Sequence, residues 1–121
     1  MEPWRISIQS ELEPLEMGID RAVPSALILN ELVSNAFKHA FPSGRKGQIR
    51  VAFRQSEPGM LELSVEDDGI GFPVHGPEQE SQSLGLRIVS ILTRQLDGSL
   101  RQEYCAGTRF VLRFPAESAI N

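Results

Sequence analysis

The sequence predicts an α+β fold, a two-layer α/β sandwich in which helices cover one face of a mixed, mostly antiparallel sheet. Three observations lead to this prediction. Strand-like alternation recurs in five segments, two segments repeat apolar residues at helical spacing, and short turns separate the last four strands in pairs. The chain has 121 residues, which favours a single domain spanning residues 1–121 with an ordered core over about residues 5–115.

Composition argues against several functional classes. The net charge is −4 and no basic run occurs, so we expect neither a nucleic-acid surface nor contact with an anionic membrane. No apolar stretch approaches membrane-spanning length, and the first residues lack the pattern of a secretory signal. The lone Cys105 excludes an internal disulfide and is interpreted as a packing residue. The expected location is the cytoplasm.

The first half of the chain predicts a strand followed by a long helix. Residues 5–11 alternate, with Ile6 and Ile8 on one face, and predict a short strand at an edge of the sheet. Residues 12–21 are acidic and irregular. A helix is expected from about Ser25 to Ala40, with Pro24 in its first turn and Ser25 as a cap. Residues 42–44 end it, and residues 45–47 form a basic turn.

This helix carries two different faces on a 3.6-residue wheel. Its apolar side consists of Leu29, Leu32, Val33, Ala36 and Ala40. Its polar side consists of Glu31, Asn35, Lys38 and His39. A carboxylate, a carboxamide, an ammonium and an imidazole together can hold a metal ion and the phosphates that it bridges. The alternative is a solvated polar face with no site.

Two strands follow as a hairpin. Residues 48–55 and 60–67 alternate, and residues 56–59 between them have the composition of a turn. Asp67 shares the alternation of Leu61, Leu63 and Val65, so its side chain is expected to point inward, while Asp68 points outward. An inward carboxylate is costly without a partner. Asp67 therefore needs a buried donor, supplied by the protein or by a ligand.

The second half begins with glycine-rich sequence. Gly69 and Gly71 let the backbone approach a flat ligand, and the polar residues 73–83 are expected to form a functional loop or lid. A helix opening at residues 83–86 runs to about Leu96, with a buried stripe of Leu86, Val89, Leu92 and Leu96. Strands are expected at 99–105 and 108–114, after a helix break at residues 97–98. Pro115 ends the pattern, and residues 116–121 are expected to fray.

Four pieces in this order resemble the ATP-binding catalytic domain of sensor histidine kinases, in the superfamily shared with DNA gyrase and MutL. Residues 30–41 (NELVSNAFKHAF) resemble the N box, and residues 67–71 (DDGIG) the first glycine box. Residues 83–89 (SLGLRIV) resemble the second glycine box, and residues 107–110 (GTRF) the last box. The closest resemblance is to the subgroup whose N box carries Asn-Glu-Leu and ends in His-Ala-Phe-Pro. The resemblance spans about residues 6–115 and implies a Bergerat fold.

The resemblance also implies ligands and roles. The implied ligands are ATP and Mg²⁺, with Asn35 coordinating the metal and Glu31 acting as the catalytic carboxylate. Lys38 and His39 would contact phosphate oxygens, and Asp67 would accept the adenine amino group. The remaining nucleotide contacts would come from Gly69, Ile70, Gly71, Phe72, Ser83, Leu84, Gly85, Leu86 and Thr108. The implied partners are a dimerisation domain carrying the phosphoacceptor histidine, and a response regulator downstream.

The sequence departs from the family pattern in three places. The loop before Ser83 lacks a phenylalanine-centred box, and Ser83 replaces a common glycine. The chain also shows no dimerisation helices and no phosphoacceptor histidine, so the expected behaviour in isolation is ATP binding without autophosphorylation. Two alternatives stay open: a regulatory module of the same fold, similar to the anti-sigma serine kinases, and a degenerate copy that binds nothing. Asn35, Asp67, Gly69 and Gly71 argue against the degenerate copy.

Overall fold

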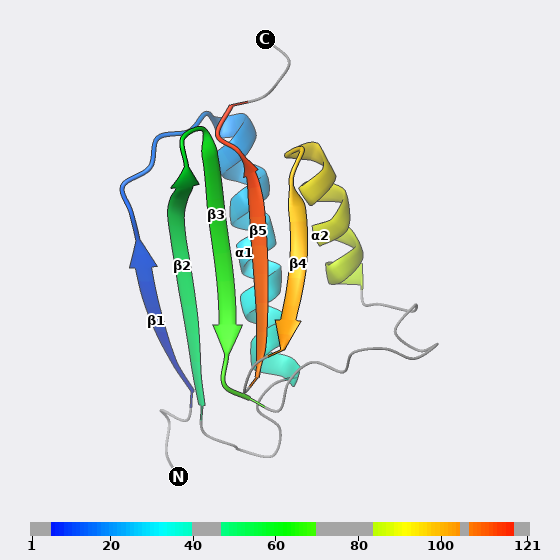
Figure 1. Cartoon of the computed structure of the whole chain (residues 1–121). Coiled ribbons are helices and arrows are strands. Elements are labelled where there is room, and N and C mark those ends of the chain that lie inside the picture. The colour runs from blue at the N-terminus through cyan, green and yellow to red at the C-terminus, as the bar shows by residue number, and fades with distance from the viewer. Residues whose placement is uncertain (1–5, 40–46, 70–83, 105–106, 118–121) are drawn as a thin grey trace.

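The computed structural model describes residues 6–39, 47–69, 84–104 and 107–117. Its elements are β1 (Ile6–Leu12), α1 (Ile19–His39), β2 (Gly47–Glu57), β3 (Met60–Asp67), α2 (Leu84–Gln95), β4 (Ser99–Tyr104) and β5 (Thr108–Pro115). The strand order is β1-β2-β3-β5-β4. β1 pairs with β2 in parallel, and the other pairs are antiparallel. Both helices lie on one face of the sheet (Figure 1). The predicted fold class is confirmed.

The hydrophobic core lies between the sheet and the two helices. The central strands contribute alternate residues, among them Leu63, Leu112 and Phe114, which are fully buried. On α1 the centre of the buried face is Ile28 and Leu32, whereas the sequence pattern included Leu29 and Val33, which are only partly buried. The α2 stripe is as predicted, with Val89 and Leu96 fully buried. None of the described helices is long and apolar enough to cross a membrane.

The edge position predicted for the first strand is confirmed, but its apolar face is not covered. Ile8 pairs with Ile49 and Leu12 pairs with Phe53, so both face the helical layer. They are nevertheless 51% and 63% exposed. The reason is visible in Figure 1, where α1 runs behind β3 and β5 while β1 and β2 lie to one side of it.

The start of α1 was predicted wrongly. The helix begins at Ile19, six residues before the expected Ser25, and Pro24 lies inside it. The Gly18 carbonyl accepts the N–H groups of Arg21 and Ala22 at 3.0 and 2.9 Å, which starts the helical ladder. Proline removes one donor from that ladder, and tertiary contacts of the early residues offset the loss. Ser25 is not a cap, because its hydroxyl is buried and donates to the Ala22 carbonyl at 3.1 Å.

Arg21 supplies the strongest of those tertiary contacts. Its guanidinium is buried and donates to the Leu96 carbonyl at 2.7 Å and to the Gln95 carbonyl at 3.3 Å. It also reaches the Pro115 carbonyl at 3.4 Å. The carbonyl groups at a helix C-terminus lack partners in their own helix and carry partial negative charge. Arg21 therefore caps the end of α2 and ties it to the start of α1.

The turns follow the predicted chemistry. β2 extends to Glu57, which pairs with Met60, so the hairpin turn consists of Pro58 and Gly59, the latter with φ of 81°. Asp97, two residues after the end of α2, lies in the left-handed region with φ of 54°. Ala116, which was expected to fray, is held in place, because its N–H donates to the Gly59 carbonyl at 2.9 Å and it packs against the core. Residues 118–121 lie outside the described residues. Cys105 and the turns at residues 42–46 lie outside the described residues.

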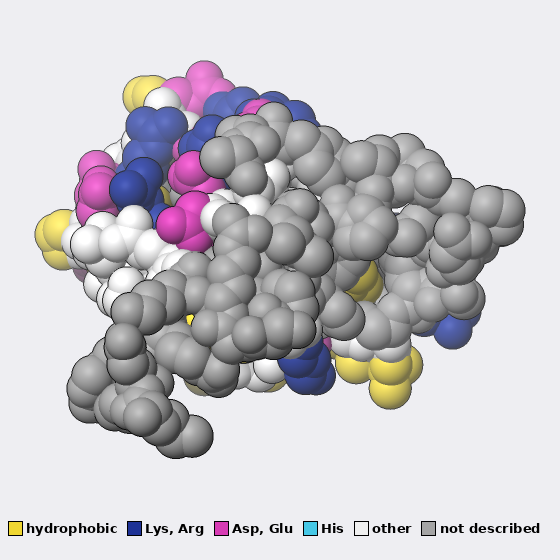
Figure 2. Space-filling view, turned by 90° about the horizontal axis from the view of Figure 1, so that it is seen from below, with side chains coloured by type: hydrophobic (Ala, Val, Ile, Leu, Met, Phe, Trp, Pro, Cys, Tyr) yellow, Lys and Arg dark blue, Asp and Glu magenta, His cyan; other side chains and the backbone are white. Residues whose placement is uncertain are grey.

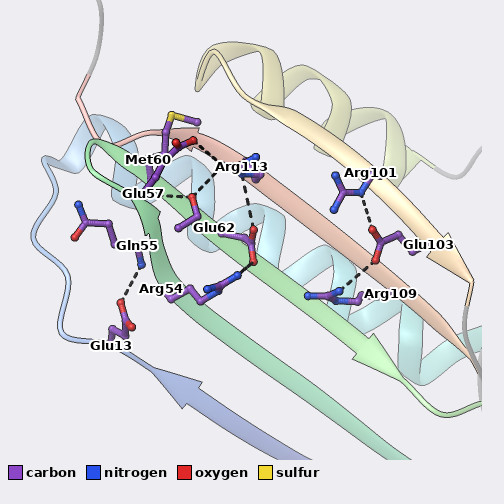
Figure 3. A network of polar contacts seen from close by, with 11 residues as sticks. Glu13, Arg54, Gln55, Glu57, Met60, Glu62, Arg101, Glu103, Arg109 and Arg113 are labelled. Atoms are coloured by element: carbon purple, nitrogen blue, oxygen red, sulfur yellow. Dashed lines mark hydrogen bonds and ion pairs between the residues drawn. The ribbon is translucent and has the colours of Figure 1, made fainter.

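The face of the sheet without helices carries a network of ion pairs (Figure 3). Glu62 is largely buried between two arginines, at 3.0 Å from Arg54 and 3.8 Å from Arg113. Glu103 joins Arg101 at 2.7 Å and Arg109 at 3.2 Å. Arg101 and Glu103 both belong to β4, whereas the other three pairs join neighbouring strands. Opposite charges matched across strands stabilise an antiparallel sheet.

We predict that Arg21→Met destabilises the fold by about 1–3 kcal/mol, because buried carbonyls at the end of α2 lose their donor. Arg101→Met is the control, since its ion pair is exposed and such pairs contribute at most about 1 kcal/mol. Urea unfolding followed by circular dichroism measures both. Equal losses in the two variants would contradict the capping role of Arg21.

Candidate functional site

Asp67 lies at the last position of β3 with its side chain turned inward, as the alternation predicted. It is 7% exposed, whereas the next residue, Asp68, is exposed and accepts the Gln48 N–H at 2.8 Å. The Asp67 Oδ1 atom accepts the Gly69 N–H at 2.9 Å and the Thr108 N–H at 3.4 Å. Two of the hydrogen-bond donors that an inward Asp67 carboxylate needs are therefore backbone N–H groups of the protein itself.

Burial makes the Asp67 carboxyl unusual electrostatically. Desolvation raises the pKa of Asp67 above its ordinary value of 3.8, and the negative charges of Asp68 and Glu66 raise it further. The hydrogen bonds from Gly69 and Thr108 act in the opposite direction, but they do not cancel the desolvation. Ionised Asp67 thus favours an additional hydrogen-bond donor or positive charge.

Gly107 and Thr108 form the wall next to this carboxyl. Thr108 is 1% exposed and is paired with Asp67 in the β3–β5 register. A Cβ atom at Gly107 would collide with the Asp67 backbone carbonyl and would lie 2.7 Å from Oδ1. Only glycine fits here without a backbone shift. Gly107 belongs to the GTRF motif, but no role was predicted for it; the available signal was a glycine directly before the final strand.

The polar face of α1 supplies Glu31 and Asn35, one helical turn apart. Asn35 is 4% exposed, and its Nδ2 atom has no hydrogen-bond partner among the described residues. Glu31 is half-buried, and nothing in the described part of the chain forms a hydrogen bond or ion pair with its carboxylate. A buried amide with an unsatisfied atom is uncommon in folded proteins, so this face does not behave as an ordinary solvated one.

Glu31 also lies against the start of α2. A Cβ atom at Gly85 would collide with the Glu31 carboxylate. Leu84 opens α2 and is exposed, while Leu86 is half-buried and packs against the core. The first N–H groups of a helix have no acceptor within it and attract anions. Carboxylate, amide and helix N-terminus therefore lie together on one side of α1.

The predicted residues thus form two described groups. One group is Asp67, Gly69 and Thr108; the other is Glu31, Asn35 and Gly85. Both lie toward the same end of the molecule in Figure 1, where β3 ends and β5 begins. Lys38 is exposed near the end of α1. The His39 side chain and Ile70, Gly71, Phe72 and Ser83 lie outside the described residues.

Figure 2 looks onto this end of the molecule. Most of the Lys and Arg side chains that it shows lie next to Asp and Glu side chains on one flank, and others lie apart from that flank. The described part of the chain has no group of three or more His, Cys, Asp or Glu side chains that could hold a metal ion by themselves. Asn35 and Glu31 nevertheless fit Mg²⁺, which takes oxygen ligands and is usually held by one or two protein groups with water and phosphate.

The family model for histidine kinase-, DNA gyrase B- and HSP90-like ATPases matches residues 22–118. The sensor histidine kinase PdtaS of Mycobacterium tuberculosis is 38% identical over 117 residues, which cover 93% of this chain and 23% of that protein. This chain therefore spans about a quarter of the length of that relative. The solved histidine kinase domain of the Erythrobacter litoralis EL346 blue-light activated kinase superposes with a TM-score of 0.84 at 26% identity. That match covers 93% of this chain and 52% of the other.

A shorter similarity connects the chain to a different kind of protein. The anti-sigma F factor of Priestia megaterium is 28% identical over 67 residues, covering 55% of this chain and 46% of that protein. This similarity covers less of the chain than the similarity to the sensor kinase does.

We predict opposite outcomes for two glycine-to-alanine substitutions. Gly107→Ala should destabilise the protein by about 1–3 kcal/mol, because the new methyl group meets backbone that cannot move independently. Gly85→Ala should stay within about 1 kcal/mol of wild type, because the flexible Glu31 side chain can swing away and alanine favours the helix. Thermal unfolding of both variants tests this. A stable Gly107→Ala variant would show that Gly107 does not lie against Asp67.

We also predict that Asp67→Asn stabilises the nucleotide-free protein at pH 7. A carboxyl whose pKa is higher in the folded state contributes stability that is complete below the unfolded value and is lost as pH rises through the folded value. The variant has no charge to desolvate, so its advantage should shrink as pH falls toward 3.8. Urea unfolding from pH 3 to pH 8 measures the difference. An advantage that grows toward low pH would contradict the raised pKa.

Proposed function

The chain belongs to the family of histidine kinase-, DNA gyrase B- and HSP90-like ATPases, and on that basis we propose that it is the ATP-binding catalytic domain of a sensor histidine kinase. Its N box, with Asn-Glu-Leu at residues 30–32 and His-Ala-Phe-Pro at residues 39–42, points to the subgroup with that motif. The similarity to PdtaS over 93% of the chain supports the same assignment. A cytoplasmic location fits a domain that uses ATP.

Asp67 is the observation on which the proposal depends. Its buried carboxylate is held by the N–H groups of Gly69 and Thr108 and favours one more donor. The exocyclic amino group of adenine is such a donor, and a site built to hydrogen-bond that group discriminates strongly against bases without it. In the proposed complex, Gly69, Ile70, Gly71 and Phe72 pass beside the base, and Thr108 helps to hold the ring.

The opposite side of the site receives the phosphates. We assign the metal ligand to the side-chain oxygen of Asn35, because Mg²⁺ takes oxygen ligands. The Asn35 Nδ2 atom is a donor without a partner among the described residues, so it suits a phosphate oxygen. We assign further phosphate contacts to Lys38, His39, Ser83 and the backbone of Leu84, Gly85 and Leu86. The N-terminus of α2 suits anionic oxygens. Bound Mg²⁺ would neutralise charge on the phosphate oxygens during transfer.

Glu31 has the properties of a catalytic carboxylate in this arrangement. It lies next to the start of α2 and has no ion-pair partner among the described residues, so it is available to accept a proton. In the proposed reaction the bond between the γ-phosphorus and the bridging oxygen of ATP breaks and a bond to an imidazole nitrogen forms. ADP leaves, and Glu31 accepts the imidazole proton or orders water around the metal. The imidazole belongs to a separate dimerisation domain, and the phosphoryl group then passes to a response regulator.

The second candidate is a regulatory serine kinase of the anti-sigma type, which the similarity to the anti-sigma F factor favours. The two candidates share the nucleotide site and differ in the acceptor. Phosphohistidine is acid-labile and phosphoserine is stable in acid. Acid treatment of the labelled acceptor therefore separates them.

We predict that the isolated domain binds Mg·ATP with little hydrolysis. Asp67→Asn and Asn35→Ala should each weaken binding at least tenfold, because each removes a buried polar contact worth about 1.5–3 kcal/mol. Isothermal titration calorimetry measures the affinities. Matched controls are Asp68→Asn, directly after Asp67, and Asn30→Ala, on the same helix as Asn35; both side chains are exposed. Unchanged affinity in both site variants would refute the proposed nucleotide site.

Glu31→Gln should separate binding from chemistry. Because a general base contributes about 10²–10⁴-fold to a rate, the variant should bind Mg·ATP within about threefold of wild type and phosphorylate the acceptor domain at least a hundredfold more slowly. Radiolabel transfer to that domain is the measurement. Full activity of the variant would remove Glu31 from the mechanism and leave the nucleotide site untouched.

A further inference from the structure

A cavity of about 510 Å³ opens on the helical side of the sheet. Its floor is Phe53 of β2 and Leu63 of β3, and its roof is formed by Leu15 and Met17 of the connection between β1 and α1. One flank of α1 lines a further side. The described residues that line it are separate from those assigned to the nucleotide site above. The volume lies within the range of small-molecule sites, about 300–1,000 Å³.

The cavity exists because the helical layer is narrower than the sheet. Figure 1 shows α1 behind β3 and β5, with β1 and β2 beyond its edge. The flank of α1 that faces the cavity carries the small residues Ala22, Ser25 and Ala26 within two turns. Larger side chains at these positions would fill the space. Ser25 is held by its bond to the Ala22 carbonyl, so it does not swing into the cavity.

The lining favours an apolar ligand with a positive charge. Phe53 contributes an aromatic ring to the lining, and Leu15, Met17, Leu29 and Leu63 contribute apolar surface. Within the described part of the chain, Glu16 is the one charged residue in the lining, and it is exposed. No lysine or arginine of that part lines the cavity, and the guanidinium of nearby Arg21 is bound to carbonyls at the end of α2. An anion such as a nucleotide has no described partner here.

We propose that this cavity is a second binding site, for a small aromatic molecule that carries an amine. The aromatic body stacks on Phe53 beneath Leu15 and Met17, and the ammonium group meets the Glu16 carboxylate at the mouth. Ammonium groups also interact favourably with aromatic faces. The charge of the lining thus selects a ligand of the opposite sign from ATP.

The site shares a helix with the nucleotide site. α1 lines the cavity with residues 22–29 and carries Glu31 and Asn35 farther along. A helix moves as a rigid unit over this length, so a ligand that shifts the first half of α1 also shifts Glu31 relative to Gly85. Any such coupling is reciprocal, because each ligand must change the affinity of the other by the same factor.

The test uses three bicyclic probes of similar size: 1-naphthylmethylamine, which is a cation at pH 7, neutral 1-naphthalenemethanol, and anionic naphthalene-1-sulfonate. Methyl NMR of the full chain should show shifts at Leu15, Met17, Leu29 and Leu63 with the amine. The sulfonate should bind at least tenfold more weakly.

Shifts confined to other methyl groups, or equal binding of the sulfonate, would overturn the proposal. Purely competitive displacement, in which the apparent Kd of the amine rises without limit as Mg·ATP increases, would do so as well, because the probe would then occupy the nucleotide site; coupling between separate sites changes the affinity only by a finite factor.

Two variants and a control sharpen the test. Ala26→Leu fills the cavity and should weaken amine binding at least tenfold without changing Mg·ATP affinity. Glu16→Gln removes the charge at the mouth and should reduce the preference for the amine over the alcohol at least threefold. Val23→Leu changes an exposed position on the same helix and should have no effect. Wild-type amine binding by Ala26→Leu would overturn the proposal. A change in sedimentation caused by Ala26→Leu would also overturn it, because the cavity would then be a contact between copies of the chain.

Discussion

The buried carboxylate of Asp67 is the constraint around which the end of the sheet is organised. Its Oδ1 atom joins the turn after β3 to the start of β5 through the Gly69 and Thr108 N–H groups. The same close approach leaves no room for a side chain at Gly107. Desolvation makes the ionised form costly in the empty protein. The protein therefore holds, at a cost in stability, a group that a bound donor would satisfy.

The helix α1 links this constraint to the rest of the molecule. Arg21 near its start contacts Leu96 at the end of α2, and Glu31 farther along contacts Gly85 at the start of α2. The two helices run antiparallel, as Figure 1 shows. Hydrogen bonds from Arg21 join them at one end, and at the other Glu31 lies against Gly85. Each contact suits the charge at that end of α2, because the Arg21 cation meets the C-terminal carbonyl groups and the Glu31 carboxylate lies at the N-terminal N–H groups. The other flank of α1 lines the cavity.

Several features of the site could be predicted because they depend on local periodicity. The inward direction of Asp67 followed from its alternation with Leu61, Leu63 and Val65, and the shared face of Glu31 and Asn35 followed from helical spacing. Spacing could not show that Asn35 is buried with an unsatisfied amide atom, because burial depends on which elements pack against the helix. The closeness of Gly107 to Asp67 and of Gly85 to Glu31 likewise joins residues far apart in the chain.

The sequence alone determined the fold class, the strands and helices of the described chain, and the order of the motifs, because alternation, helical spacing and turn residues act over a few neighbouring positions. Only the tertiary structure decided where α1 begins. Local signals favoured Pro24 and Ser25, but the bonds from Arg21 to the end of α2 and the Gly18 carbonyl stabilise a helix that starts at Ile19. The tertiary structure also decided that β1 and β2 extend beyond the helical layer. The cavity beside α1 arises from the relative widths of two layers, which no single segment of sequence encodes.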